Sequence, residues 1–221
     1  MSVNEKLSSV KKLSQTSIQY WAILGMLTAL LAVLTACGLG FIRIGPSFSV
    51  TLFPILVAIA ATSLGPSGGT VMGFIFGTAS LIAGITGVDT TGAAMFAINP
   101  IKSTLACYVP RIIMGFLCGV IFKLADNAVK KHDKPNFISH CAACASAALL
   151  NTLLFLFSVW LFFGNEPIVL EITGGSRNFL ILLAVFAVNA LIELAINITV
   201  GTAISKTIEK VNRVYAPGQQ S

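Results

Sequence analysis

Charged residues are scarce in this chain. Only 10% of its 221 residues are Asp, Glu, Lys or Arg, whereas 56% are hydrophobic and the mean hydropathy is +0.89. A soluble domain carries about 25% charged residues, so most of these apolar side chains are expected to face lipid. Because one span needs about 20 apolar residues, the length predicts about six spans with short connections. We expect a single membrane domain over residues 1–221 and no separate soluble domain.

Several signatures of chemistry are absent too. No G-x-x-x-x-G-K-[ST] sequence occurs, so the chain has no P-loop for ATP, and no H-E-x-x-H occurs for a catalytic zinc ion. Cys141 and Cys144 form a C-x-x-C pair inside an apolar run, but no further ligands converge nearby, so small packing residues are the simpler interpretation. No Ser or Cys stands beside a recognisable base. The sequence therefore predicts no enzyme activity and no cofactor bound by this chain.

What is present is a set of six apolar segments, separated by Gly- and Pro-containing breakers. They are continuously apolar, which favours helices over barrel strands of about ten alternating residues. The segments cover about residues 18–37, 48–64, 68–86, 103–124, 137–163 and 178–205. The predicted fold class is an all-α integral membrane protein with six transmembrane helices.

The basic residues give the direction of threading. Ten of the fourteen lie on one side of the spans: Lys6, Lys11, Lys12, Lys123, Lys130, Lys131, Lys134, Lys206, Lys210 and Arg213. The positive-inside rule places this side in the cytoplasm. Both termini are then cytoplasmic, as six spans require, with short tails over about 1–16 and 206–221. These residues lie beside hydrophobic runs and form no basic domain, so the net charge of +6 does not indicate nucleic-acid binding.

The first segment has a second interpretation. Leu34-Thr35-Ala36-Cys37 resembles a lipoprotein cleavage box, and cleavage there would leave Cys37 lipidated and remove the first span. However, the segment is about 20 residues long, which exceeds the 7–15 residues of a signal h-region. Its removal would also leave five spans, so we favour a retained transmembrane helix.

Arg111 is the main candidate for ligand binding. It belongs to the four basic residues on the outer side, Arg43, Lys102, Arg111 and Arg177. Unlike the others it lies within a span, where a charge costs several kcal/mol unless it is paired or hydrated. Its guanidinium could bind a carboxylate through two parallel hydrogen bonds. Arg43 and Lys102 lie at the rim and could steer an anion inward.

Neutral polar residues complete the predicted outer site. Asn151 and Asn189 would supply donors and acceptors, and Asn99 could close over the ligand. Asn189 begins a stripe that continues at Glu193 and Asn197, spaced four residues apart. Counted from residue 178 at 1.5 Å per residue, Glu193 lies about 22 Å into its span, past the midplane. That depth favours a structural or coupling role, and a structural Arg111–Glu193 ion pair is the alternative to a ligand at Arg111.

Two segments carry small residues at every fourth position, which lets another helix approach closely. Segment 68–86 has Gly69, Gly73 and Gly77, and we expect these to pack within the chain. Segment 18–37 has Gly25 and Ala29, followed by Ala32 and Ala36. For Gly25, Ala29 and Ala32 a partner protein is as plausible as internal packing.

The order of four motifs resembles the substrate-binding (S) component of an energy-coupling factor vitamin transporter. The motifs are the Gly25/Ala29 step, the loop 41–46 (FIRIGP) leading to 51–55 (TLFPI), the turn 64–69 (LGPSGG), and Asn99-Pro100 followed by 110–115 (PRIIMG). The resemblance spans nearly the whole chain. It implies six helices in a prokaryotic plasma membrane, both termini on the inner side, and an outer ligand pocket built from the loop between the first two helices, the loop between the third and fourth helices, and the last three helices.

The same resemblance implies partners. These are a small-molecule vitamin, a coupling membrane protein that meets the small-residue face of the first helix, and two ATPase subunits that hydrolyse ATP. Pantothenate-specific members similarly carry an arginine and an asparagine where this chain has Arg111 and Asn151, which favours a small anionic B vitamin such as pantothenate. Folate or another vitamin or precursor remains open. Outside this family, the alternatives are a stand-alone carrier or channel and a structural membrane protein.

Overall fold

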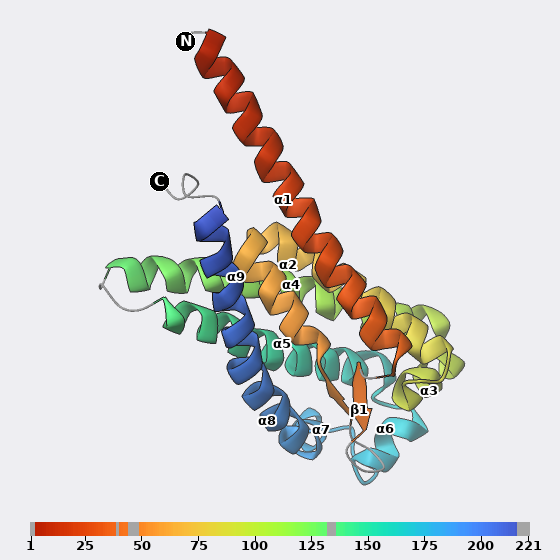
Figure 1. Cartoon of the computed structure of the whole chain (residues 1–221). Coiled ribbons are helices and arrows are strands. Elements are labelled where there is room, and N and C mark those ends of the chain that lie inside the picture. The colour runs from red at the N-terminus through yellow and green to blue at the C-terminus, as the bar shows by residue number, and fades with distance from the viewer. Residues whose placement is uncertain (1–2, 39, 44–48, 132–135, 216–221) are drawn as a thin grey trace.

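The computed structural model describes residues 3–38, 40–43, 49–131 and 136–215, and the described part is built almost entirely from helices (Figure 1). The elements are α1 (Val3–Ala36), β1 (Phe41–Arg43), β2 (Ser49–Thr51), α2 (Phe53–Ile85), α3 (Thr90–Ile98), α4 (Pro100–Lys131), α5 (Phe137–Phe163), α6 (Pro167–Ile172), α7 (Phe179–Val185), α8 (Ala187–Ile196), the π-helical turn η1 (Asn197–Gly201) and α9 (Thr202–Tyr215). Of the predicted tails, residues 1–2 and 216–221 lie outside this description.

Five helices of the described part are long and apolar enough to cross a membrane: Ile18–Ala36, Phe53–Ile85, Pro100–Lys130, Phe137–Phe163 and Ala187–Lys210. The all-α prediction is confirmed apart from β1 and β2, two three-residue strands that pair antiparallel with Ile42 opposite Val50. The predicted helical start at residue 48 is therefore wrong, because residues 49–51 form β2 and the helix begins at Phe53.

The predicted segments 48–64 and 68–86 both fall within α2, which consists of two helical segments. They meet at Gly65, whose φ of 75° and ψ of −167° suit glycine and interrupt the helix. Pro66 follows and has no N–H to continue the hydrogen-bond ladder. A Cβ added at Gly69 would lie 3.0 Å from the Cβ of Ala61, although eight residues of continuous helix span about 12 Å. The chain therefore doubles back at Gly65, as Figure 1 shows.

The second half of α2 packs against α4 through glycines. A Cβ at Gly69 would collide with the carbonyl oxygen of Gly115, and one at Gly73 with that of Arg111. At Gly77 a Cβ would lie 3.1 Å from the carbonyl oxygen of Cys107. The two backbones thus touch along three successive helical turns. This confirms that the small-residue stripe of 68–86 packs within the chain.

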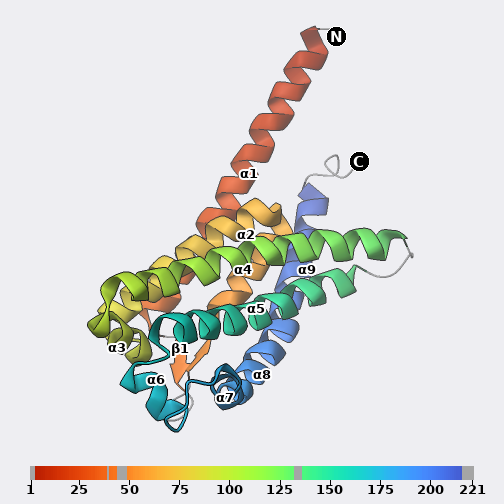
Figure 2. The ribbon, with the colours of Figure 1, turned by 180° about the vertical axis from the view of Figure 1, so that it is seen from behind.

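Helix α1 covers the bundle with one face only. Leu24, Leu27 and Leu31 lie in one buried apolar cluster with side chains of α2. Gly25 and Ala29, on another face of α1, are exposed. The N-terminal part of α1 extends beyond the other helices, and the start of α1 and the end of α9 lie towards the same end of the bundle (Figures 1 and 2). The opposite end holds the β-hairpin, α3, α6 and α7.

A buried chain of hydrogen bonds joins α2, α5 and α9. His140 of α5 is 2% exposed, and its Nδ1 lies 2.6 Å from Ser205 Oγ while its Nε2 lies 3.0 Å from a carboxylate oxygen of Glu209. Ser205 Oγ also lies 2.6 Å from Thr62 Oγ1. The sequence suggested no serine beside a base, but the structure places Ser205 beside His140. With Ser205 only 1% exposed and absent from the pocket wall described below, we interpret the chain as a structural tie between helices.

Candidate functional site

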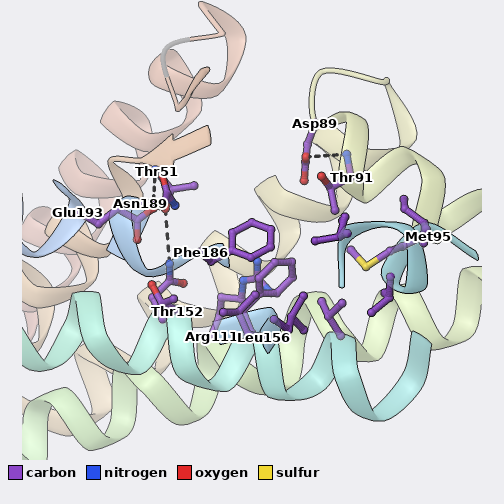
Figure 3. Close-up of a pocket in the computed structure, with 17 residues that line it drawn as sticks. Thr51, Asp89, Thr91, Met95, Arg111, Thr152, Leu156, Phe186, Asn189 and Glu193 are labelled. Carbon is purple, nitrogen blue, oxygen red and sulfur yellow. Dashed lines mark hydrogen bonds between the residues drawn. The ribbon is translucent and has the colours of Figure 1, made fainter. Parts of the chain in front are cut away.

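A pocket lies at the end of the bundle that holds α3, α6 and α7, enclosed by α4, α5 and α8 (Figure 3). Its cavity volume is about 90 Å³, several times the roughly 10–15 Å³ that one water molecule requires. Apolar side chains from α3, α5, α6 and α7 form much of the wall, among them Met95, Leu156, Ile168 and Leu182. A few polar groups converge among them, which is the usual composition of a small-ligand site.

Arg111 lies in the middle of the pocket wall, and its position follows from the seam between α2 and α4. The side chain is 6% exposed, and its Nη1 donates a 2.6 Å hydrogen bond to the carbonyl oxygen of Ala106. Its guanidinium carbon lies 4.3 Å from the centroid of Phe155 and 5.3 Å from that of Phe76. Aromatic faces attract a cation at these distances. The guanidinium is therefore held in place before any ligand binds, and its Nε has no hydrogen-bond partner among the described residues.

Thr51, Asn189 and Glu193 form one end of the pocket (Figure 3). Glu193 Oε1 accepts two 2.8 Å hydrogen bonds, from the backbone N–H and the hydroxyl of Thr51. Thr51 occupies this position because it ends β2, directly before α2 begins. Asn151 Nδ2 donates to the same Thr51 hydroxyl over 3.5 Å. A β-hairpin residue thus links α5 to α8.

Asp89 and Thr91 form the other end of the pocket, with Arg111 and Phe186 between the two ends (Figure 3). Asp89 precedes α3, and its carboxylate accepts a 3.2 Å hydrogen bond from the backbone N–H of Thr91. This is an ordinary N-cap, in which a side-chain oxygen satisfies a free N–H of the first helical turn. Asp89 therefore contributes a second fixed carboxylate to the pocket wall.

Three of the six predicted binding residues meet at this pocket, namely Arg111, Asn151 and Asn189. Two others do not line it. Asn99 accepts hydrogen bonds from the backbone N–H groups of residues 101 and 102 and caps α4, while the exposed Lys102 donates over 3.4 Å to the carbonyl oxygen of Phe162. The side chain of Arg43 lies outside the described residues.

The predicted depth of Glu193 is wrong, and the cause is a break in the last span. Residues 179–185 form the separate helix α7, which ends at Phe186, and the membrane-length helix begins at Ala187. Glu193 is therefore six residues into that helix, about 9 Å from its start, and it lines the pocket. The Asn178 side chain caps the start of α7 by accepting a 2.9 Å hydrogen bond from the N–H of Leu180. The break at Phe186 was not visible in the sequence, because the residues on both sides of it are apolar.

The predicted alternative of an Arg111–Glu193 ion pair is not what the structure has. Arg111 and Glu193, whose side chains are both described, form no ion pair within 4.0 Å. Arg111 instead contacts aromatic rings and a carbonyl oxygen. Both charges therefore remain available to a ligand.

Sequence reasoning missed several lining residues, including Thr51, Asp89, Thr91, Thr152 and Phe155. The Asp89-x-Thr91 spacing is typical of a helix cap, so α3 itself could have been found from the sequence. Nothing in the sequence indicated that Thr51 would reach Glu193, which lies 142 residues away. That contact depends on the packing of the hairpin against α8.

Comparison with known proteins agrees with this architecture. The sequence model of the family described as "ECF transporter, substrate-specific component" matches residues 19–205. The comparison with curated proteins gives no match. The matched stretch contains the five membrane-length helices except for the ends of the first and the last, together with every residue that lines the pocket. The chain therefore belongs to the family of substrate-specific components of energy-coupling factor transporters.

Proposed function

We propose that this chain is the high-affinity vitamin-binding subunit of an ATP-driven importer and that its ligand is a small carboxylate vitamin, with pantothenate as the first candidate. Members of the family are transporter subunits and not enzymes. One observation carries the choice of ligand: Arg111 is buried at the pocket wall without a carboxylate within ion-pair distance among the described residues. A ligand carboxylate would supply the missing charge through a bidentate contact.

The apolar wall supports a ligand with a hydrophobic middle. Leu156, Val159 and Val169 are buried and face the same cavity as Arg111. Burial of apolar ligand surface against such side chains contributes about 25 cal/mol per Å². The polar groups at the two ends would then fix the orientation of the ligand and the apolar wall would supply much of the affinity.

The proposed topology counts α2 as two crossings, because its chain doubles back at Gly65. Six crossings then leave both termini in the cytoplasm of a prokaryotic plasma membrane, in agreement with the ten basic residues on that side. The partners would be a coupling membrane protein and two ATPase subunits, which would hydrolyse the ATP, and this chain would bind no cofactor. The exposed small residues of α1, Gly25, Ala29 and Ala32, support a docking face for the coupling protein.

Calorimetry on the protein purified in detergent tests the ligand. Pantothenate is expected to bind without ATP, and Arg111→Ala is expected to weaken binding by about 10- to 150-fold, since a hydrogen bond to a charged group contributes about 1.5–3 kcal/mol. Arg177→Ala is the matched control, because Arg177 is exposed, stacks on Trp160 at 5.3 Å and does not line the pocket.

Equal pantothenate affinity in wild type and Arg111→Ala would refute the role of Arg111. Binding of folate or another vitamin in place of pantothenate would refute the choice of ligand and leave the class of protein intact. Uptake of vitamin into liposomes that contain only this chain would instead support the alternative of a stand-alone carrier.

A further inference from the structure

The polar end of the pocket offers hydrogen-bond acceptors that nothing in the described structure fills. Glu193 Oε2, Asn151 Oδ1 and Asn189 Oδ1 are all buried and have no hydrogen-bond partner among the described residues. Their side chains are 2%, 8% and 9% exposed, respectively, and all three line the cavity. Buried polar atoms in native proteins are almost always paired, so three unpaired acceptors at one place indicate a missing set of donors.

The hydrogen-bond chain around Thr51 determines which atoms are free. The hydroxyl of Thr51 has one hydrogen, which it donates to Glu193 Oε1 at 2.8 Å. It can therefore only accept from Asn151, so the NH₂ group of Asn151 must face Thr51 and its carbonyl oxygen must face away. Because the backbone N–H of Thr51 also donates to Oε1, the second oxygen of Glu193 is left for another donor.

The formal charge at this end of the pocket is negative, as is the partial charge of the unpaired acceptor oxygens. Among the described residues that line the cavity, Glu193 is the one charged side chain at this end, since Arg111 lies between the two ends and Asp89 at the other end (Figure 3). Arg111 is held by Ala106 and Phe155 and forms no ion pair with Glu193. An anionic group placed beside Glu193 would meet that carboxylate and the carbonyl oxygen of Asn151, which repel it. The Asn189 amide, which no described residue orients, can turn its carbonyl oxygen towards a ligand donor. A group with O–H or N–H bonds would satisfy these acceptors.

We propose that this end is a donor subsite, in which Glu193, Asn151 and Asn189 receive hydroxyl or N–H groups of the ligand, and that Glu193 determines which ligands bind. The proposal rests on the function proposed above and adds to it the chemistry of the ligand end that Arg111 does not contact. The ligand class is an amphipathic small molecule whose polar head carries at least two O–H or N–H donors. A simple carboxylate without such donors is excluded, even though Arg111 could bind it.

Calorimetry with two sets of probes tests this. Pantothenate, pyridoxine, thiamine, riboflavin and folate all carry O–H or N–H donors, whereas lipoate and nicotinate are carboxylates without further donors. At least one probe of the first set is expected to bind, and neither probe of the second set. Glu193→Gln is then expected to lower the affinity for the probe that binds by 10-fold or more. Glutamine keeps one oxygen for Thr51 but replaces the free acceptor by an NH₂ group that repels a donor.

Glu171→Gln is the matched control, because Glu171 is an exposed residue of α6 outside the pocket wall. This variant should bind the probe with the affinity of wild type. Asn189→Ala is a second variant that should fold normally, since no described residue hydrogen-bonds the Asn189 side chain, and it should also weaken binding. Thermal unfolding of each variant checks that it is folded.

Two results would overturn the donor subsite while leaving the vitamin-binding function standing. One is unchanged or tighter binding in folded Glu193→Gln, which is the result expected if the ligand placed an anion there. The other is binding of lipoate or nicotinate as tight as that of the best donor-bearing probe. If wild type bound none of the seven probes, both the subsite and the vitamin-binding function would be refuted.

Discussion

Replacement of Gly73 by alanine is expected to destabilise the protein, whereas the same replacement at Gly25 is not. A Cβ at Gly73 would collide with the backbone carbonyl oxygen of Arg111, and its next neighbours are also backbone atoms of α4. A backbone carbonyl cannot rotate away as a side chain can, so α2 and α4 must separate. A Cβ at Gly25 meets nothing within 4 Å. The two substitutions therefore have identical chemistry and differ only in the space available.

The magnitudes follow from these surroundings. Overpacking costs about 1–3 kcal/mol and occasionally more, and a rigid carbonyl as the obstacle places Gly73→Ala towards the upper end. Alanine recovers up to about 1 kcal/mol of helix propensity at either position. We expect a net loss of about 1–3 kcal/mol at Gly73 and a gain of up to about 1 kcal/mol at Gly25. For a chain of this size 1 kcal/mol shifts the unfolding temperature by about 2–4 °C.

Thermal unfolding in one detergent, followed by the fluorescence of Trp21 and Trp160, measures both variants against wild type. Gly73→Ala should unfold about 2–12 °C lower, and Gly25→Ala at the same temperature or up to about 4 °C higher. Because Gly73 packs on the backbone of Arg111, vitamin affinity should fall in Gly73→Ala as well. Equal unfolding temperatures for the two variants would refute the close approach of α2 and α4.

Three further predictions concern other parts of the chain. Ala29→Trp adds bulk to the exposed face of α1, so the isolated subunit should bind its vitamin normally but fail to co-purify with the coupling protein; an intact complex would contradict the docking face. His140→Ala removes the hydrogen bonds that His140 makes to Ser205 and Glu209 and leaves a cavity at a buried site, which should lower the free energy of unfolding by about 2–4 kcal/mol in denaturant titrations while affinity stays unchanged, since His140 is not in the pocket wall. Lys102→Ala should slow association of an anionic vitamin in stopped-flow measurements at low salt but not at high salt, since exposed charges are screened; equal rates at low salt would exclude steering.

Features set by local sequence were predictable. The apolar lengths predicted the helices, and the Gly65-Pro66 pair predicted the turn inside α2, because both residues restrict the backbone directly. The glycine spacing of Gly69 and Gly73 predicted a close helix contact within the chain. Arg111 was identified because an intramembrane charge needs a partner wherever it lies.

Features set by long-range packing were not predictable. The break at Phe186 occurs in a continuously apolar stretch, so hydropathy could not distinguish α7 from the span after it. The error moved Glu193 from the pocket to the far half of its helix. Likewise, Thr51 became a site residue only through its pairing in the hairpin and its contact with α8. Neither contact leaves a periodic signal in the sequence.

The glycine seam between α2 and α4 divides the pocket into a part that tolerates substitution and a part that does not. Next to Arg111, a Cβ at Gly69 or Gly73 would collide with a backbone carbonyl oxygen, so substitutions at these two positions would disrupt the seam. Away from the seam, Ile168 and Leu182 line the cavity from helices of six and seven residues, so a change of apolar side chain there alters the pocket wall without touching the seam. A lineage of such proteins could therefore acquire new ligands by changing α6 and α7 while the scaffold that positions the guanidinium stayed the same.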